Sequence, residues 1–358
     1  MKTLTLKLEN KSYDIHIEKG SVQRRLLETL CTNDDYVILT DQNIHTIYGV
    51  MFEGFNLIKI PAGEGSKSVG TYEKVMNEMA SMGITRAGVI IALGGGVVGD
   101  LAGFVAATYK RGIKWIQIPT TLLAMVDSSV GGKVGINLDA GKNLAGAFYQ
   151  PEAVYIDSEF LKTLPTREFS NGMAEVIKYG LGFEEALFNK LEHYDQSDMN
   201  NHIEDIIASC CAIKSNLVMV DEKDLSVRNF LNFGHTIGHA IEHYFSYEKY
   251  LHGESVAIGM AAMARIAQEK GELTMQAFKR IILLIKKFDL PICFDDEMGK
   301  NYLAIRSILE AVQVDKKSSG IMITWIGLKR IGALEMTKSP VDSAISIFAG
   351  GLHANSKL

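Results

Sequence analysis

Short apolar runs alternate with helical patterns through the first half of the chain, and this alternation is the feature that most constrains the fold. Helical periodicity occupies residues 70–82 and 97–109, between apolar stretches of strand length. Those stretches are residues 36–40, 56–60, 88–93, 115–118 and 153–156. Strands that alternate with helices favour a mostly parallel, doubly wound α/β sheet.

From about residue 160 the pattern changes to periods near 3.6 residues, which are typical of helices. These stretches are residues 203–219, 235–245, 256–270, 275–288 and 302–312. A chain of 358 residues suggests two domains. We predict an α/β domain over residues 1–158 and an all-α domain over residues 159–358. No linker separates them, so we expect the domains to meet closely, with a ligand cleft between them.

Composition excludes several classes of protein. The net charge of -5 argues against broad binding of nucleic acid, although local basic residues can still bind a small anion. The N-terminus lacks the apolar core of a signal peptide, and no stretch resembles a membrane span. Cys31, Cys210, Cys211 and Cys293 show no CxxC spacing, which favours reduced thiols. We therefore expect a cytoplasmic protein.

Glycine is concentrated in one region, because twelve of the 33 glycines lie between Gly88 and Gly146. Gly94, Gly96 and Gly99 follow an apolar strand, open a helix and satisfy the pattern GxGxxG. Glycines at such a turn let backbone N–H groups approach a phosphate. The motif follows a later strand, however, and has no acidic residue about 20 positions on. Taken alone, it fits a tightly packed turn as well as a nucleotide site.

Other predicted strand ends carry polar residues too. They are Asp41, residues 63–67, residues 94–100, Thr120 and Thr121. The carboxyl ends of parallel strands meet at one edge of a sheet, where α/β proteins bind ligands. Each residue has a local alternative; Asp41, for example, could simply cap the next helix. Their convergence favours a dinucleotide site.

A polar, glycine-rich segment follows the predicted sheet. It contains Asp127, Lys133, Lys142 and Asn143, and Arg111 lies upstream. Lysines beside a glycine-rich backbone suit the recognition of phosphate or carboxylate. A solvated hairpin is the alternative interpretation.

Histidines in the second half indicate a metal site. His235, His239 and His243 stand at positions i, i+4 and i+8, on one face of a helix, and His252 follows. Glu175 lies in another predicted helix, three residues before Lys178. Spacing leaves open whether His235 and His239 bind with a carboxylate or another set of three ligands does so. It favours His243 as a bystander. Three protein ligands with an open position would indicate a catalytic metal.

Several of these motifs, taken in order, resemble the 3-dehydroquinate synthase family of the shikimate pathway. They are residues 93–100, 126–137, 142–143, 172–178, 231–240 and 252–254. The resemblance extends from Asp41 to Lys317. It implies an N-terminal α/β NAD domain, a C-terminal helical metal domain and a homodimer. Gly65, Ser66 and Ser226 depart from the family's usual residues, but none of them removes a charged contact.

The resemblance also implies a set of site residues. The implied zinc ligands are Glu175, His235 and His252, for which cobalt is an equally suitable ion. The implied NAD contacts are Asp41, Gly63, Glu64, Lys67, Gly95, Gly96, Val97, Val98, Gly99, Asp100, Thr120, Thr121, Lys133, Lys142, Phe160 and Thr163. The implied substrate contacts are Arg111, Asp127, Lys133, Asn143, Lys178, Lys214, Arg228, Asn232, His239 and one of Lys316 and Lys317. His239 would then be a substrate or proton-relay residue.

The implied reaction converts 3-deoxy-D-arabino-heptulosonate 7-phosphate to 3-dehydroquinate and phosphate. It proceeds through transient oxidation by NAD, β-elimination of phosphate, re-reduction and an intramolecular aldol closure. The rival predictions are another NAD- and zinc-dependent sugar-phosphate cyclase, a metal-dependent polyol dehydrogenase, and a non-catalytic NAD-binding protein. The last would be expected to lose metal ligands or substrate lysines, and this sequence has them all.

Overall fold

The computed structural model describes residues 1–30, 35–294, 301–310 and 322–355. The chain forms two compact units. Unit 1 comprises Met1–Pro165 and Ile203–Lys223, and unit 2 comprises Thr166–His202 and Asp224–Leu358. The chain thus passes between the units more than once, where the sequence suggested a single boundary after residue 158. No helix within the described ranges is long and apolar enough to cross a membrane.

Unit 1 contains a seven-stranded sheet with the strand order β1-β2-β9-β6-β5-β3-β4. The strands are β1 (Lys2–Lys7), β2 (Ser12–Ile17), β3 (Tyr36–Asp41), β4 (Leu57–Ile60), β5 (Val89–Gly94), β6 (Lys114–Pro119) and β9 (Ala153–Ile156). Only β1 and β2 pair in antiparallel fashion; the other neighbours are parallel. Every residue of β5 is buried, as expected for a parallel strand that is covered on both faces. The predicted α/β sheet is confirmed.

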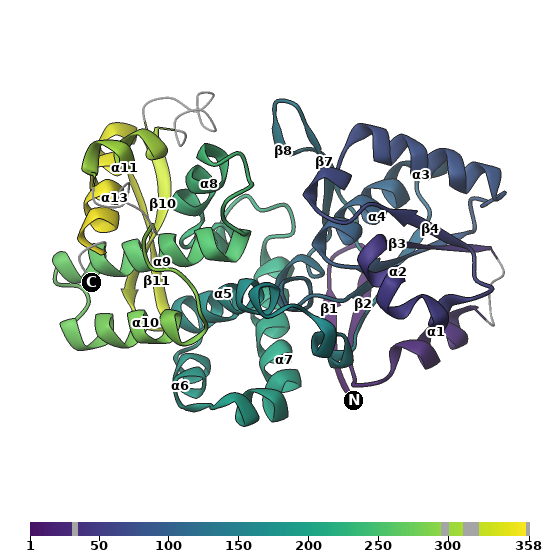
Figure 1. Ribbon diagram of the computed structural model, residues 1–358, viewed down its shortest axis with the longest axis horizontal. Coiled ribbons are helices and arrows are strands. Elements are labelled where there is room, and N and C mark those ends of the chain that lie inside the picture. The colour runs from purple at the N-terminus through teal and green to yellow at the C-terminus, as the bar shows by residue number, and fades with distance from the viewer. Residues whose placement is uncertain (31–34, 295–300, 311–321, 356–358) are drawn as a thin grey trace. The chain divides into compact units, whose positions relative to one another are not determined.

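Helices connect these strands (Figure 1). They are α1 (Val22–Leu30), α2 (Gln42–Tyr48), η1 (Gly49–Phe52), η2 (Glu64–Ser66), α3 (Val69–Ser81), α4 (Gly96–Thr108), η3 (Tyr109–Arg111), η4 (Ala124–Ser128) and η5 (Ser158–Thr163). Helix α7 (Gln196–Val220) adds its later part to unit 1. Its Cys210 and Cys211 are buried and form no disulfide among the described residues, and burial raises the pKa of Cys211 to about 12.

A hairpin of β7 (Lys133–Leu138) and β8 (Gly141–Phe148) holds the polar segment that the sequence singled out. Val134 and Ile136 of β7 are buried in one core with α3, α4 and the sheet. Where Gly146 faces the backbone of Val134, a Cβ would lie 2.5 Å from the carbonyl oxygen of Val134. Glycine is therefore needed for the two strands to approach. The hairpin interpretation is right for the backbone, and the same hairpin carries the predicted contact residues.

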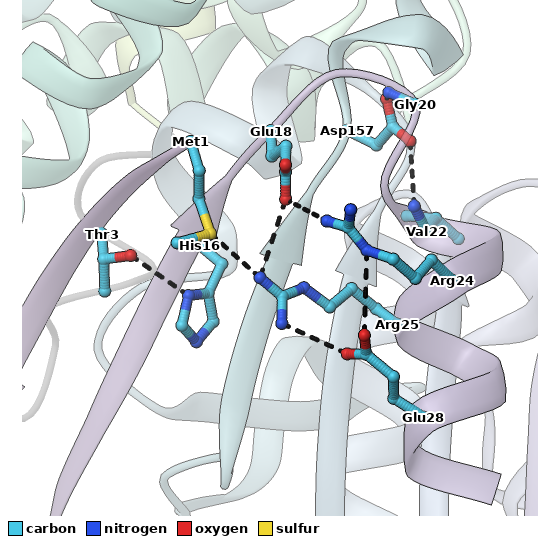
Figure 2. A network of polar contacts seen from close by, with 10 residues as sticks. All are labelled: Met1, Thr3, His16, Glu18, Gly20, Val22, Arg24, Arg25, Glu28 and Asp157. Carbon is cyan, nitrogen blue, oxygen red and sulfur yellow. Dashed lines mark hydrogen bonds and ion pairs between the residues drawn. The ribbon is translucent and has the colours of Figure 1, made fainter. Parts of the chain in front are cut away.

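The N-terminal corner of unit 1 fixes the start of η5 (Figure 2). Asp157 is almost fully buried, and its carboxylate accepts hydrogen bonds from the N–H groups of Gly20 at 2.7 Å and Val22 at 3.1 Å. It also accepts one from the N–H of Glu159 at 3.0 Å, which caps η5. Nearby, Arg25 forms ion pairs with Glu18 and Glu28. This corner therefore anchors the short helix that carries Phe160 and Thr163.

Unit 2 is largely helical, as predicted. Its elements are α5 (Thr166–Gly182), α6 (Glu185–His193), η6 (Val227–Asn232), α8 (His235–Tyr244), α9 (His252–Glu269), α10 (Met275–Lys287), α11 (Tyr302–Leu309), β10 (Met322–Arg330), β11 (Ala333–Pro340) and α13 (Val341–Asn355). The prediction of an all-α second domain needs one correction, because β10 and β11 form an antiparallel hairpin. Trp325 of β10 packs edge-on against Phe348 of α13, so the hairpin is part of the core of this unit.

Candidate functional site

The glycine motif forms the turn between β5 and α4. Gly95 is the N-cap residue of α4, and the helix begins at Gly96. The first N–H groups of a helix lack partners within the helix, so they can bind an anion. A Cβ on Gly95 would lie 3.1 Å from Cγ2 of Thr121, and a Cβ on Gly96 would lie 3.2 Å from Oγ of Ser128. Glycine thus allows a neighbouring segment with hydroxyl groups to lie close against this helix end.

Three buried hydroxyl groups near the turn have no hydrogen-bond partner among the described residues. They belong to Thr120, Ser128 and Ser129. A buried hydroxyl without a partner costs about 1–3 kcal/mol, so such groups indicate a place where a polar ligand binds. Thr121 is satisfied, because its Oγ1 accepts a hydrogen bond from the N–H of Ala124 at 3.2 Å. The helix end and the unpaired hydroxyls together fit the pyrophosphate and ribose groups of a dinucleotide.

Lys67 is the centre of a polar cluster in unit 1. Its Nζ donates to Asp100 at 2.7 Å and to Asn143 at 2.6 Å, and it lies 3.7 Å from Glu64. Lys67 itself is only 4% exposed. Burial lowers the pKa of Lys67, but Asp100 and Glu64 outweigh burial and raise the pKa above its usual value. The structure therefore brings three predicted contact residues together around one buried, charged lysine, which is itself a fourth.

Asn137 belongs to the same cluster, although no role for it was predicted. Its Nδ2 donates to Glu64 at 2.8 Å, and its Oδ1 accepts from the N–H of Asn143 at 2.9 Å. Its own N–H donates to the carbonyl oxygen of Lys67 at 2.7 Å. Asn143 has a left-handed φ of 56°, which the hydrogen bond from its N–H to Asn137 helps to hold. Asn137 thus connects the hairpin to the Lys67 cluster.

Asp127 and Lys214, both predicted to contact substrate, form an ion pair in unit 1. Lys214 donates to the carbonyl oxygen of Asp127 at 2.7 Å and also contacts its carboxylate. Lys214 comes from α7, and Asp127 comes from η4. The lysine side chain is only 8% exposed, so the pair is largely removed from solvent. The structure therefore brings these two charged residues together, and their contact with substrate stays a prediction.

Helix α2 contacts three of the predicted NAD-binding residues, which are Asp41 at its start and Phe160 and Thr163 at its end. Oδ1 of Asp41 caps α2 by accepting from the N–H groups of Asn43 at 2.9 Å and Ile44 at 3.0 Å. Tyr48 ends that helix, with its hydroxyl 2.5 Å from Oγ1 of Thr163 and its ring 5.0 Å from the ring of Phe160. The cap interpretation of Asp41 is thus confirmed, and a role in NAD binding stays a prediction. Tyr48 was missed by the sequence analysis.

The other predicted contact residues of unit 1 lie on several different elements. Lys133 begins β7, and Lys142 lies on β8. Gly63, with a φ of 97°, precedes η2. Arg111, however, follows the C-terminal end of α4, so the length of β6 separates it from Thr120. The structure does not bring Arg111 together with the strand-end residues of its own chain.

In unit 2, three side chains form a compact group of possible metal ligands. Oε1 of Glu175 lies 3.4 Å from Nε2 of His235 and 3.3 Å from Nε2 of His252. One ligand atom from each residue lies within 4.8 Å of the others. Glu175 is fully buried on α5, and the two histidines are the first residues of α8 and α9. Three separate helices therefore bring their ligand atoms to one point.

The hydrogen bonds behind the two rings determine which nitrogen faces Glu175. Nδ1 of His235 lies 3.1 Å from the carbonyl oxygen of Phe233, and Nδ1 of His252 lies 3.3 Å from Oε2 of Glu242. A carbonyl or carboxylate oxygen only accepts, so both Nδ1 atoms carry the proton. The Nε2 lone pairs then face Oε1 of Glu175, which has no donor among the described residues. Two imidazole nitrogens and one buried carboxylate oxygen that converge in this way fit a metal ion.

The charges around Glu175 support the same interpretation. Burial raises the pKa of Glu175, but Lys178 and His235 outweigh burial and hold that pKa well below its usual value. Lys178 is 1% exposed and pairs with Oε2 of Glu175. Burial lowers the pKa of His252, but the carboxylates of Glu175 and Glu242 outweigh burial and raise the pKa to about 10, so they favour positive charge at this ring. The site therefore stabilises a cation between these groups.

The geometry bears on the alternative that sequence spacing left open, because it groups Glu175, and not His239, with His235 and His252. His239 is exposed on α8, with its ring 5.4 Å from that of His235 and 6.1 Å from that of His252. It lies beside the group of Glu175, His235 and His252, and it belongs to a second possible group with Glu242 and His252. The ring of His243 instead lies 6.5 Å from that of Tyr247.

The remaining predicted contacts of unit 2 precede α8. Arg228 is 2% exposed on η6, and Asn232 is the last residue of that helix. Gly234, with a left-handed φ of 79°, then turns the chain into α8. This order places Arg228 and Asn232 just before the ligand His235. Lys316 and Lys317 lie outside the described residues.

Gly253 sets the position of His252 relative to Glu175. Its N–H donates to Oδ1 of Asn171 at 2.5 Å, and a Cβ there would lie 2.0 Å from the carbonyl oxygen of Asn171. We expect Gly253→Ala to push α9 away from α5, to raise the zinc dissociation constant and to destabilise the fold by about 1–3 kcal/mol. Chelator competition and urea unfolding measure these effects. Gly350→Ala is the control, because a Cβ on Gly350 meets nothing within 4 Å; equal zinc affinity in both variants would contradict the prediction.

Known proteins resemble most of the chain. Residues 57–171 match the family described as 3-dehydroquinate synthase N-terminal, and residues 172–318 match 3-dehydroquinate synthase C-terminal. A 3-dehydroquinate synthase of Clostridium acetobutylicum is 45% identical over 343 residues, which cover 93% of this chain and 95% of that relative.

Solved structures agree on the fold. The 2-epi-5-epi-valiolone synthase of Streptomyces hygroscopicus, with NAD+ and Zn2+ bound, is 25% identical with a TM-score of 0.85, and the match covers 98% of both chains. A 2-deoxy-scyllo-inosose synthase complexed with carbaglucose-6-phosphate, NAD+ and Co2+ is 24% identical with a TM-score of 0.82, and the match covers 99% of both chains.

Proposed function

The chain belongs to the 3-dehydroquinate synthase family, and from that premise we propose that it converts 3-deoxy-D-arabino-heptulosonate 7-phosphate to 3-dehydroquinate and phosphate. The observation that carries the proposal is the group of Glu175, His235 and His252, whose potential ligand atoms converge at one point. Such a group suits a catalytic metal, which this reaction uses to polarise hydroxyl groups of a sugar. By reaction type, this enzyme is a phosphate-eliminating carbon–oxygen lyase of aromatic amino-acid biosynthesis.

NAD fits unit 1. The residues that would hold it are the glycine turn at the start of α4, the unpaired hydroxyl of Thr120 and the Lys67 cluster. When bound, NAD supplies an acceptor for a hydride and later returns that hydride. Asp100 and Glu64 hold Lys67 in its charged form, so the lysine offers a fixed positive charge beside this region. A bound NAD+ in the valiolone synthase supports the proposal.

Zinc or cobalt fits Glu175, His235 and His252. Two imidazole nitrogens and one carboxylate oxygen suit either ion, and relatives of this fold bind Zn2+ or Co2+. When bound, the metal supplies a Lewis acid for vicinal hydroxyl groups. Lys178 holds the carboxylate of Glu175 in its ionised form, and Phe233 and Glu242 hold the two imidazole rings.

The remaining work of the chain is to bind and orient a substrate that carries a phosphate and a carboxylate. The cations that would do so are Lys133, Lys178, Lys214 and Arg228. Arg228 and Lys214 are buried, so their charges are weakly screened and suit a multiply charged anion. The substrate's own phosphate takes the proton before it leaves, so the protein mainly positions and polarises. Asn143, Asn232 and His239 would complete the polar contacts.

Release of inorganic phosphate tests the proposal. Purified protein with NAD and zinc should release phosphate from 3-deoxy-D-arabino-heptulosonate 7-phosphate and should not do so at a comparable rate from glucose 6-phosphate. Glucose 6-phosphate is the sugar whose carba-analogue is bound in the inosose synthase. Equal rates on both sugars would favour another cyclase of the same fold. No phosphate release from either would contradict the proposed function.

We further propose that the protein is a cytoplasmic homodimer, as the resemblance implies. Cys210 and Cys211 form no disulfide among the described residues, which is compatible with a reducing compartment. Sedimentation velocity measures the state of association directly. A single species near the mass of one 39.4 kDa chain, at micromolar concentration, would contradict the dimer.

A further inference from the structure

We propose that Glu242 is a positioning residue that selects the metal-binding nitrogen of His252. Glu242 lies on α8 and is only 5% exposed. Its Oε2 lies 3.3 Å from Nδ1 of His252, while Nε2 of the same ring lies 3.3 Å from Oε1 of Glu175. The inference rests on the proposed function only in that it concerns the metal site of that function.

A neutral imidazole ring carries one proton and one lone pair, and either nitrogen can hold the proton. A carboxylate beside Nδ1 stabilises the form with the proton there, because the carboxylate can only accept. The lone pair is then on Nε2, which faces Glu175 and His235. Without Glu242, the ring can place its proton on Nε2 and lose its affinity for the ion. The carboxylate also fixes the rotation of the ring.

The helix that holds Glu242 also supplies a ligand. His235 begins α8, and Glu242 follows seven residues later, about two helical turns along the same face. Helix α8 lies close against α9, since a Cβ on Gly238 would lie 3.2 Å from the backbone N of Val256. This close packing lets Glu242 reach the His252 ring, which belongs to α9. A change at Glu242 therefore acts on the metal through a ring that the neighbouring helix holds.

Glu242 has an alternative role as a direct ligand, since its carboxylate also lies near His239 and His252. In that arrangement His252 would bind through Nδ1. One ion cannot bind both nitrogens of a single ring, so the two arrangements exclude each other. Burial favours the first: Glu175 is fully buried with no donor on Oε1 among the described residues, whereas His239 is exposed. A fully buried carboxylate such as Glu175 is stabilised more by a bound cation than a group that water can solvate.

The test measures zinc affinity of the metal-free full-length chain by competition with a chelator, so it does not depend on turnover. We expect Glu242→Leu to raise the dissociation constant about 10–100-fold while one ion still binds per chain. The dissociation constant of Glu242→Gln should be closer to that of the parent protein, because the amide oxygen of the glutamine can still accept a hydrogen bond from Nδ1 of His252. His243→Ala, an exposed neighbour on α8, should leave the affinity unchanged.

Two results would overturn the inference. One is an unchanged dissociation constant in Glu242→Leu. The other is loss of the bound ion in Glu242→Gln, which would make Glu242 a ligand. Nitrogen-15 NMR of the zinc-loaded parent protein gives an answer that needs no variant: a protonated Nδ1 and a metal-bound Nε2 in His252 are expected, and the reverse refutes the inference. Failure of phosphate release would leave these binding results intact, so the two failures are distinguishable.

Discussion

His235→Ala is expected to lose its bound zinc and on the order of 10³-fold of its phosphate-releasing activity while it keeps the NAD affinity of the parent protein. His235 supplies one of the three lone pairs that converge beside Glu175, so two ligands remain in the variant. A Lewis acid contributes several kcal/mol to such a reaction, which corresponds to the stated factor. The residues proposed to hold NAD belong to unit 1, whereas His235 belongs to unit 2. NAD binding should therefore persist.

Metal analysis and calorimetric titration with NAD measure the two parts of this prediction separately. His243→Ala is the matched control, since it removes a histidine from the same helix at an exposed position. It should keep its metal and its activity. Stoichiometric zinc in His235→Ala would show that the ligand set is wrong, even if activity were lost.

Lys67→Met is expected to destabilise unit 1 by about 3 kcal/mol and to weaken NAD binding at least about tenfold. The substitution leaves the carboxylate of Asp100 without its cation, and breaking a buried pair from one side costs about 3–5 kcal/mol. The lower end applies because the Asp100 side chain is 23% exposed. Asn143 loses a donor at the same time, so the hairpin segment near the proposed NAD contacts loosens.

Urea unfolding and calorimetric titration with NAD check this prediction. Lys74→Met is the control, because Lys74 pairs with Glu78 on α3 with 58% of its side chain exposed. An exposed pair of this kind contributes about 0.3–0.5 kcal/mol, so the control should unfold almost as the parent does. A variant at Lys67 that unfolds at the same urea concentration as the Lys74 variant would contradict the structural role of this lysine.

The sheet of unit 1 could be predicted from the sequence because its central strands are continuous apolar runs. The five predicted runs correspond to β3, β4, β5, β6 and β9. Strands β1 and β2 were not predicted, because an antiparallel edge with one exposed face has no long apolar run. The hairpin of β10 and β11 was missed for a related reason: a short apolar stretch does not distinguish a strand from a buried helix.

Local sequence patterns predicted less of the candidate site than of the sheet. Spacing identified His235 and His239 as a pair, but the partners in space are Glu175, 60 positions earlier, and His252 on another helix. Sequence periodicity describes one helix at a time, so it could not bring three helices together. Only the resemblance to the family implied that Glu175, His235 and His252 are the ligands. Glu242 was missed because its partner lies on the next helix, and Asn137 because its hydrogen bonds reach across the hairpin and back to Glu64.

The central claim is that the chain uses NAD without consuming it. A single reaction mixture followed for inorganic phosphate, 3-dehydroquinate and NADH absorbance tests that claim most directly. With enough substrate for many turnovers, we predict one phosphate and one 3-dehydroquinate for each heptulosonate phosphate consumed, with no net NADH. Accumulation of NADH in proportion to turnover, with no release of phosphate, would contradict the account and would identify a polyol dehydrogenase built on the same fold.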